Sequence, residues 1–300
     1  MIRGKQFNRN RLQGKYWRVI LDGTGLFYFK EKHCENCLCT KIKTEDGKTV
    51  KQYYHKVLEA KLVLSDDVII SIGTEFIENE NENVSKQDCE INAAKRLLPK
   101  IKKAYPRLPV ILQGDALYAT EPFMELCKKE YHWEYLFMQK NTRQKILGEG
   151  FEWIKAGEDA VRQHGLCKEK ESGFFANHVE KVAGKTQTMN VFEYEYHTKD
   201  KNGKTVTICF QWVTSLNLTK QNLEEMIIAR RGRWKIENGV YRIEHLNSKN
   251  SNAMKNHYLL TQISDILMQL YLAWNPYIKE LKQTIKNTSP SSPLDEKDIS

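Results

Sequence analysis

The sequence has no long hydrophobic run. It contains no stretch of about 18 apolar residues, so no segment is expected to span a bilayer. Residues 1–18 are basic and polar and lack the apolar centre of a secretory signal peptide. These two absences predict a cytoplasmic protein that has no membrane partner.

Acidic residues are fewer than basic ones. The chain has 38 Asp and Glu against 47 Lys and Arg, which gives a net charge of +9. Residues 1–18 contain no acid, and a second basic cluster lies within residues 95–107. The simplest explanation of this excess of positive charge is a polyanionic partner, and nucleic acid is the commonest such partner. The alternative is an ordinary solubilising surface.

A second Cys-x2-Cys pair is missing. The seven cysteines are scattered, and only Cys34 and Cys37 have this spacing. Structural zinc usually takes four nitrogen or sulfur ligands from two such pairs. The candidate zinc ligands are therefore His33, Cys34, Cys37 and His55. We favour reduced thiols in a hairpin loop over this zinc site, so Zn²⁺ is not an expected cofactor.

The pattern of apolar residues predicts an α/β fold. Short apolar strands at 16–22 and 109–115 each end in an aspartate, and residues 23–25 after the first strand read as a turn. Further strands are predicted at about 53–64 and 68–77. Helices are predicted at about 86–104, at 120–130, from 220 to beyond 237, and at 253–273, where seven apolar residues form a stripe.

Three hundred residues are enough for a sizeable core. We divide the chain into a first part of the catalytic core at 1–145, a β-rich insertion at 146–215 and C-terminal helices at 216–280 that complete the core. The insertion is indicated by a hairpin signal around Asn202-Gly203. Residues 281–300 are rich in Ser, Pro and charge, which predicts a disordered tail.

Three carboxylates stand out from this pattern. Asp22 and Asp115 end two strands, and functional groups of α/β sheets gather beyond strand ends. Glu237 lies on a predicted helix and shares a face with Arg230 and Arg233, because residues three and four apart are neighbours. Three such carboxylates can hold two divalent cations about 4 Å apart. Mg²⁺ suits this donor set, because it prefers oxygen ligands.

Four motifs occur in an order that resembles the catalytic core of a bacterial insertion-sequence DDE transposase. They are Asp22-Gly23-Thr24, Lys86-Gln87-Asp88-Cys89-Glu90, Gly114-Asp115-Ala116-Leu117-Tyr118 and Arg233-Trp234-Lys235-Ile236-Glu237-Asn238. The resemblance covers roughly residues 16–275.

The resemblance implies a ribonuclease-H-like mixed sheet flanked by helices, with a mostly β insertion before the helix that carries the catalytic Glu. It implies that Asp22, Asp115 and Glu237 are catalytic and bind two Mg²⁺ ions, for which Mn²⁺ can substitute. The implied reaction is DNA cleavage and strand transfer at transposon ends. The implied partners are double-stranded DNA, as transposon ends and as target, and a second copy of the chain. DNA binding would associate the protein with the nucleoid.

The chain departs from the family signature Tyr-x2-Arg-x3-Glu-x6-Lys. Arg233 and Glu237 fit it, but Arg230 takes the Tyr position and Glu244 the Lys position. The sequence begins only about 20 residues before Asp22, whereas full-length relatives carry a DNA-binding region there. A truncated or inactive transposase that binds DNA without turnover is therefore an alternative. A standalone ribonuclease-H-like nuclease or resolvase is another.

Four cations are expected to contact DNA. Arg230, Arg233 and Lys235 belong to the helix of Glu237, and Lys140 follows the strand predicted at 133–138. Exposed cations without a DNA role are the alternative for Lys140.

Overall fold

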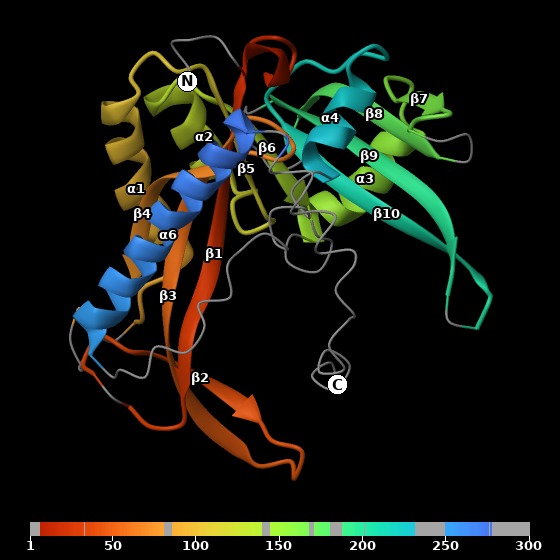
Figure 1. Cartoon of the computed structure of the whole chain (residues 1–300). Coiled ribbons are helices and arrows are strands. Elements are labelled where there is room, and N and C mark those ends of the chain that lie inside the picture. Colours follow the sequence, from red (N-terminus) through yellow and green to blue (C-terminus); the bar gives the residue numbers. More distant parts are fainter. Residues whose placement is uncertain are drawn as a thin grey trace.

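Figure 1 shows the computed structural model of the chain. It describes residues 7–32, 34–80, 86–139, 145–167, 171–180, 188–200, 202–231, 250–275 and 277. These residues form a mixed α/β structure around one sheet, whose strand order is β2-β3-β1-β5-β6-β10-β9-β8-β7, with β4 paired to β3. The prediction of a mixed α/β fold is therefore confirmed.

The first half of the sheet combines antiparallel and parallel pairs. Its strands are β1 (Trp17–Phe29), β2 (Leu38–Lys43), β3 (Thr49–Val63), β4 (Ile69–Ile77), β5 (Val110–Gly114) and β6 (Glu134–Gln139). β3 runs antiparallel to β1, β2 and β4. β5 runs parallel to both β1 and β6, so β1 is the strand where the sheet changes from antiparallel to parallel.

The second half of the sheet is antiparallel throughout. Its strands are β7 (Val161–His164), β8 (Ser172–Glu180), β9 (Thr188–Lys199) and β10 (Thr205–Thr214). β10 pairs with β6 over residues 211–214 and 136–139. The β-rich segment at 146–215 therefore extends the central sheet, and it also holds most of the helix α3 (Lys145–Ala156).

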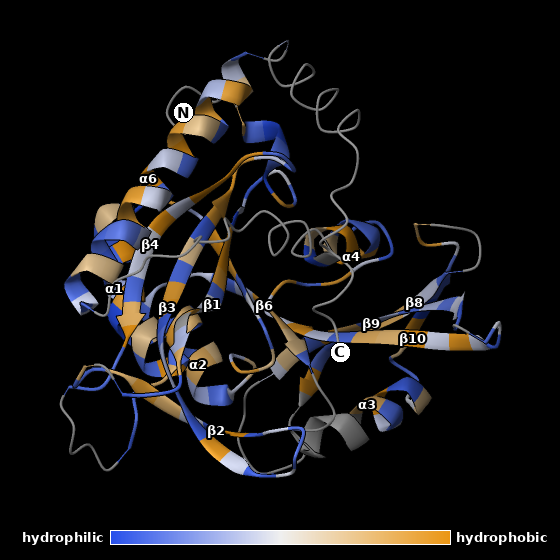
Figure 2. Ribbon diagram, turned by 60° about the horizontal axis from the view of Figure 1, so that its bottom comes forward, coloured by the Kyte–Doolittle hydropathy of each residue, from blue (hydrophilic) through white to orange (hydrophobic). Residues whose placement is uncertain are grey.

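Helices cover both faces of the sheet. They are α1 (Glu90–Ala104), α2 (Glu121–Glu125) with the π-helical turn η2 (Leu126–Glu130), α4 (Leu223–Arg231) and α6 (Ser251–Trp274), besides the 3₁₀ turn η1 (Asn8–Asn10). α1, α2 and α3 pack on the face where Leu21, Ala60 and Phe137 are buried. α4 packs on the opposite face, against Ile111 and Leu136. Figure 2 shows α3 and α4 on opposite sides of β8–β10.

β1 differs from its predicted form. It continues unbroken through residues 23–25, where the sequence predicts a turn, so Asp22 lies inside the strand rather than at its end. The reason is the length of β3, which pairs with β1 from Arg18 to Phe29. Backbone hydrogen bonds along this pair outweigh the turn preference of Gly23 and Gly25.

α6 lies close to its predicted range, but much of its apolar stripe does not face the sheet. Leu260, Ile263 and Leu267 are 54–66% exposed. Tyr258 of α6 is buried against Phe76, and polar side chains make further contacts with the sheet: Gln262 accepts from Thr74 Oγ1 at 2.9 Å, and Gln269 accepts from Ile69 N at 2.6 Å. Among the described residues, no helix combines the length and apolar character needed to cross a membrane.

Leu98 offers a test of the core under α1. Its side chain is fully buried, so Leu98→Ala is expected to lower the free energy of unfolding by about 2–5 kcal/mol. Urea denaturation measures this change. The exposed Lys95 on the same helix is the control, since Lys95→Ala should leave stability nearly unchanged. Equal effects of the two substitutions would contradict this packing.

Candidate active site

Asp22 and Asp115 lie side by side at one edge of the parallel pair. β1 and β5 are in register with Ile20 opposite Gln113, and each aspartate follows two residues later. Asp22 shares the face of Ile20, because successive side chains of a strand alternate between faces. Asp115 directly follows β5, and the charges of both aspartates act on the Tyr118 hydroxyl, so both carboxylates lie near it. Adjacent strands lie about 4.8 Å apart. The structure therefore brings together two of the three predicted acids, and both side chains are half-buried.

The Asp115 carboxylate is fixed by its own turn. Oδ1 accepts a hydrogen bond from Leu117 N at 2.8 Å, which is an Asx turn directly after β5. Within the described part of the chain this is the one hydrogen bond of the Asp115 carboxylate, so its other oxygen is available to a ligand. The turn after β5 therefore fixes the orientation of the Asp115 carboxylate.

Glu59 is a third acid on the same face, and it was not predicted. It pairs directly with Asp22 across β1 and β3 and is 4% exposed. Lys61 forms an ion pair with it at 3.0 Å, and Gln262 of α6 donates a hydrogen bond to it. Burial, and next the Glu59 charge, raise the pKa of Tyr258, which is hydrogen bonded to Glu59. Glu59 is therefore hydrogen bonded to α6, and it adds a negative charge beside Asp22.

Glu90 and Tyr118 lie beneath the strands that carry the two aspartates. The Tyr118 hydroxyl donates to Glu90 Oε1 at 3.0 Å, and Lys56 Nζ bonds Oε2 at 2.6 Å. Burial raises the pKa of Tyr118 far above its usual range, and the charges of Glu90, Asp115 and Asp22 raise it further. Tyr118 thus remains a neutral hydrogen-bond donor among the carboxylates.

Two glycines allow this close approach. A Cβ atom on Gly23 would collide with the Glu90 carboxylate, and one on Gly114 would collide with the Tyr118 ring. Each glycine adjoins one of the aspartates in sequence. The Asp-Gly and Gly-Asp pairs therefore let the Tyr118–Glu90 pair pack directly against the backbone of the site.

α4 is fastened to the strand end by Arg230. Its Nη2 donates to Gly114 O at 2.5 Å, immediately before Asp115, and the residue is only 4% exposed. Arg18 of β1 adds a bond from Nη1 to Ala229 O at 3.4 Å, and burial lowers the pKa of Arg18. The Arg230 guanidinium thus binds a backbone carbonyl inside the protein, and its predicted DNA contact stays a prediction.

The remaining predicted residues of the site lie outside the described part of the chain. These are Lys140, Arg233, Lys235 and Glu237. Within the described residues, no three acids around Asp22 have ligand atoms within 4.8 Å of one another. The described carboxylates thus supply part of an oxygen-donor site.

The basic cluster at 95–107 is partly neutralised by acids. Arg96 forms ion pairs with Glu75 at 2.8 Å and Asp88 at 2.7 Å, and Lys100 pairs with Glu75 at 2.6 Å. Such exposed pairs contribute little to stability, but they reduce the positive potential of this surface.

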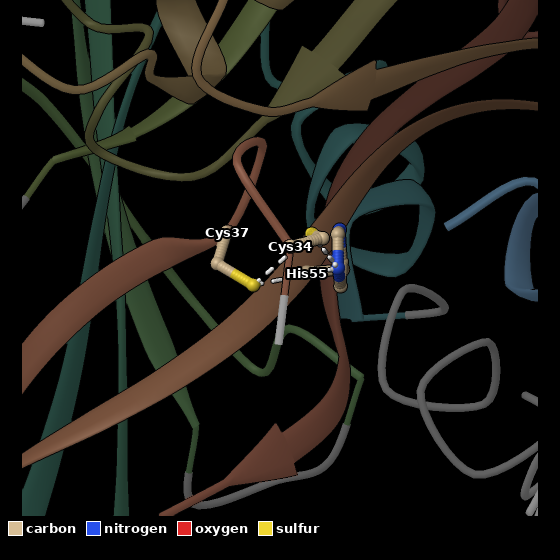
Figure 3. Close-up of side chains that lie close together, drawn as sticks. All are labelled: Cys34, Cys37 and His55. Atoms are coloured by element: carbon tan, nitrogen blue, oxygen red, sulfur yellow. Dashed lines mark hydrogen bonds between the residues drawn. The ribbon is translucent and has the colours of Figure 1, made fainter. Parts of the chain in front are cut away.

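The structure brings together three of the four candidate zinc ligands: Cys34, Cys37 and His55 (Figure 3). Cys34 Sγ lies 3.2 Å from Cys37 Sγ and 3.4 Å from His55 Nε2. Burial raises the pKa of Cys34 to about 11, with the Cys37 thiol as the next cause. His33, the fourth candidate, lies outside the described residues.

The sequence matches no protein-family model, and no curated protein matches it.

Glu59 and Glu90 are the residues that the sequence did not reveal. Glu59 interrupts an apolar run in β3, and that break in the pattern was an available signal. Glu90 belongs to one of the motifs of the family resemblance, but nothing near it in sequence indicates its contact with Tyr118. Both depend on pairings between distant segments.

Arg230→Met tests the attachment of α4. The substitution leaves Gly114 O without its side-chain donor, so we expect a loss of about 1–3 kcal/mol in unfolding free energy. Amide hydrogen exchange should also become faster in α4 than elsewhere. Ile228→Ala, at an exposed position on the same helix, is the control. Unchanged exchange in α4 would show that Arg230 does not hold it.

Proposed function

We propose that the protein is a Mg²⁺-dependent DDE transposase that cleaves DNA at transposon ends and transfers the cut strand to target DNA. The observation that carries this proposal is the pairing of parallel β1 and β5, which places Asp22 of β1 beside Asp115, the residue directly after β5. Two carboxylates from neighbouring parallel strands, one inside β1 and one directly after β5, are the part of a two-metal site that a sheet can supply.

The order of the strands supports a ribonuclease-H-like fold. The order β4-β3-β1-β5-β6 places three antiparallel strands beside two parallel ones. β2 is counted here as part of the β2–β3 hairpin and not as a separate strand. The strands in chain order are then β1, β3, β4, β5 and β6, so Asp22 belongs to the first strand and Asp115 follows the fourth. These are the positions that the family resemblance assigns to the first two catalytic acids.

The donor set fits hard divalent cations. Asp22 and Asp115 provide carboxylate oxygens, and we assign the third carboxylate to Glu237, which follows α4 in sequence. Bound Mg²⁺ would activate a water molecule and stabilise the departing oxygen of the phosphodiester. The freed 3′-hydroxyl of the cut strand would then attack a phosphodiester of the target DNA.

The residues around the two aspartates orient them. Tyr118 and Lys56 hold Glu90 against the backbone after Asp22, and the Asx turn orients Asp115. Arg230 fixes α4 to the same strand end.

The proposed partners follow from the reaction. Double-stranded DNA is the substrate as transposon end and as target, and the net charge of +9 favours its binding. Lys140, Arg233 and Lys235 are the proposed phosphate contacts. Two copies of the chain would act on paired ends, in the cytoplasm at the nucleoid.

The second candidate function is DNA binding without turnover. It is favoured by Arg230 at the Tyr position of the signature, where a buried guanidinium replaces a phenol. Glu244 at the Lys position adds a negative charge where the signature has a cation.

Substituting the three acids tests the proposal. Asp22→Asn, Asp115→Asn and Glu237→Gln each remove a charged metal ligand while keeping the side-chain shape. Each is expected to reduce Mg²⁺- or Mn²⁺-dependent nicking of supercoiled DNA by more than about 100-fold, beyond the usual effect of changes next to metal ligands. Asp46→Asn, in the exposed β2–β3 turn, is the matched control.

Circular dichroism should show that all four variants are folded. Full nicking by any of the three acid variants would refute the assignment of that acid. DNA binding by the unsubstituted protein without nicking under either metal would favour the second candidate function.

A further inference from the structure

Cys34, Cys37 and His55 come from two separate segments of the chain. The cysteines lie in the 34–37 turn between β1 and β2, and His55 lies on β3. Figure 3 shows the three side chains pointing toward one another. The β2–β3 hairpin brings His55 back beside the turn, because Leu38 pairs with Tyr54.

The spacing of the three donor atoms suits a tetrahedral ion. Zn–S and Zn–N bonds of about 2.3 and 2.0 Å place tetrahedral ligand atoms roughly 3.5–3.8 Å apart. The observed Sγ–Sγ separation is 3.2 Å, and the two Sγ–Nε2 separations are 3.4 and 3.9 Å. A shift of a few tenths of an ångström brings all three onto one ion.

The turn that carries the thiols is braced from outside. Asn79 Nδ2 donates to Cys37 O at 2.8 Å, while Asn36 Nδ2 donates to Asn79 O at 2.9 Å. Asn79 N also donates to Asn36 O at 3.1 Å. Cys37 and His55 are buried at 3% and 5% exposure. Buried ligands supported by outer hydrogen bonds are typical of structural metal sites.

A second cluster in the described residues does not suit a metal. Glu193, Glu195 and Cys209 lie close together, but the ammonium of Lys155 forms ion pairs with both glutamates. A cation therefore already occupies that cluster. The Cys34–Cys37–His55 cluster has two soft sulfur donors and an imidazole, the donor set that Zn²⁺ prefers.

We propose that Cys34, Cys37 and His55 bind one Zn²⁺ ion that fastens the 34–37 turn to β3. On binding, Zn²⁺ replaces the two thiol protons, which pass to solvent, and neutral His55 donates the lone pair of Nε2. Cys34 also lines an open cavity of about 480 Å³ beside the start of α6, through which a fourth ligand can approach.

The ion would serve the structure rather than the proposed cleavage. His55 and Glu59 share one face of β3, and Glu59 is paired with Asp22. Four residues along a strand span roughly 13 Å, so the two metal sites are separate. Zinc would hold the hairpin of β2 and β3 and the chain leaving β1, independently of whether the protein cleaves DNA.

Metal analysis of the full chain tests this proposal. Protein purified under reducing conditions should contain one zinc ion per chain, as measured by inductively coupled plasma mass spectrometry. Cys34→Ser, Cys37→Ser and His55→Gln should each reduce the zinc content by about tenfold or more, because loss of a ligand costs at least as much as loss of a residue that only supports a ligand. Cys89→Ser and Cys209→Ser are the matched controls and should retain it; Cys209→Ser also tests the second cluster.

Cobalt binding by the unsubstituted protein provides a second test, which does not depend on whether the variants fold. Unsubstituted protein freed of metal should take up Co²⁺ and show thiolate-to-metal charge-transfer bands with the intense visible bands of tetrahedral Co²⁺. Folded protein that binds neither Zn²⁺ nor Co²⁺, or a Cys34–Cys37 disulfide in protein kept under reducing conditions, would overturn the proposal. Nicking of DNA is measured separately, so failure here leaves the proposed function untouched.

Discussion

The parallel pairing of β1 with β5 is the constraint on which the candidate site depends. It sets Ile20 opposite Gln113 and so brings Asp22 of β1 beside Asp115, which directly follows β5. A shift of one residue would turn Asp115 toward the opposite face. The apolar residues around the pair resist such a shift, because Val19 and Leu112 are buried on one face and Ile111 on the other.

Local sequence patterns identified much of this arrangement. Both aspartates are associated with strands as predicted, and the helices α1 and α6 lie close to their predicted ranges. The predicted turn after Asp22 was wrong because the length of β3, a distant segment, decides how far β1 continues. The burial of Arg230 was missed for a similar reason, since its partner is a backbone carbonyl 116 residues away.

The same limit applies to the charges and thiols around the site. Glu59 reaches Asp22 only through strand pairing, and His55 reaches Cys34 and Cys37 only through the β2–β3 hairpin. A sequence shows which residues are able to bind metal, and it shows spacing within one segment. It does not show which ligands from separate segments meet, because that depends on register over the whole sheet.

The junction between β6 and β10 has a mechanical consequence. Gln139 to Leu136 pair with Gln211 to Thr214 in one continuous ladder, so the β-rich segment is hydrogen bonded to the strand next to β5. A continuous ladder provides no hinge between two halves of a sheet. If the proposed DNA substrate contacts both halves at once, this pairing resists bending of the sheet at β6, and the duplex has to supply the bending needed for the fit.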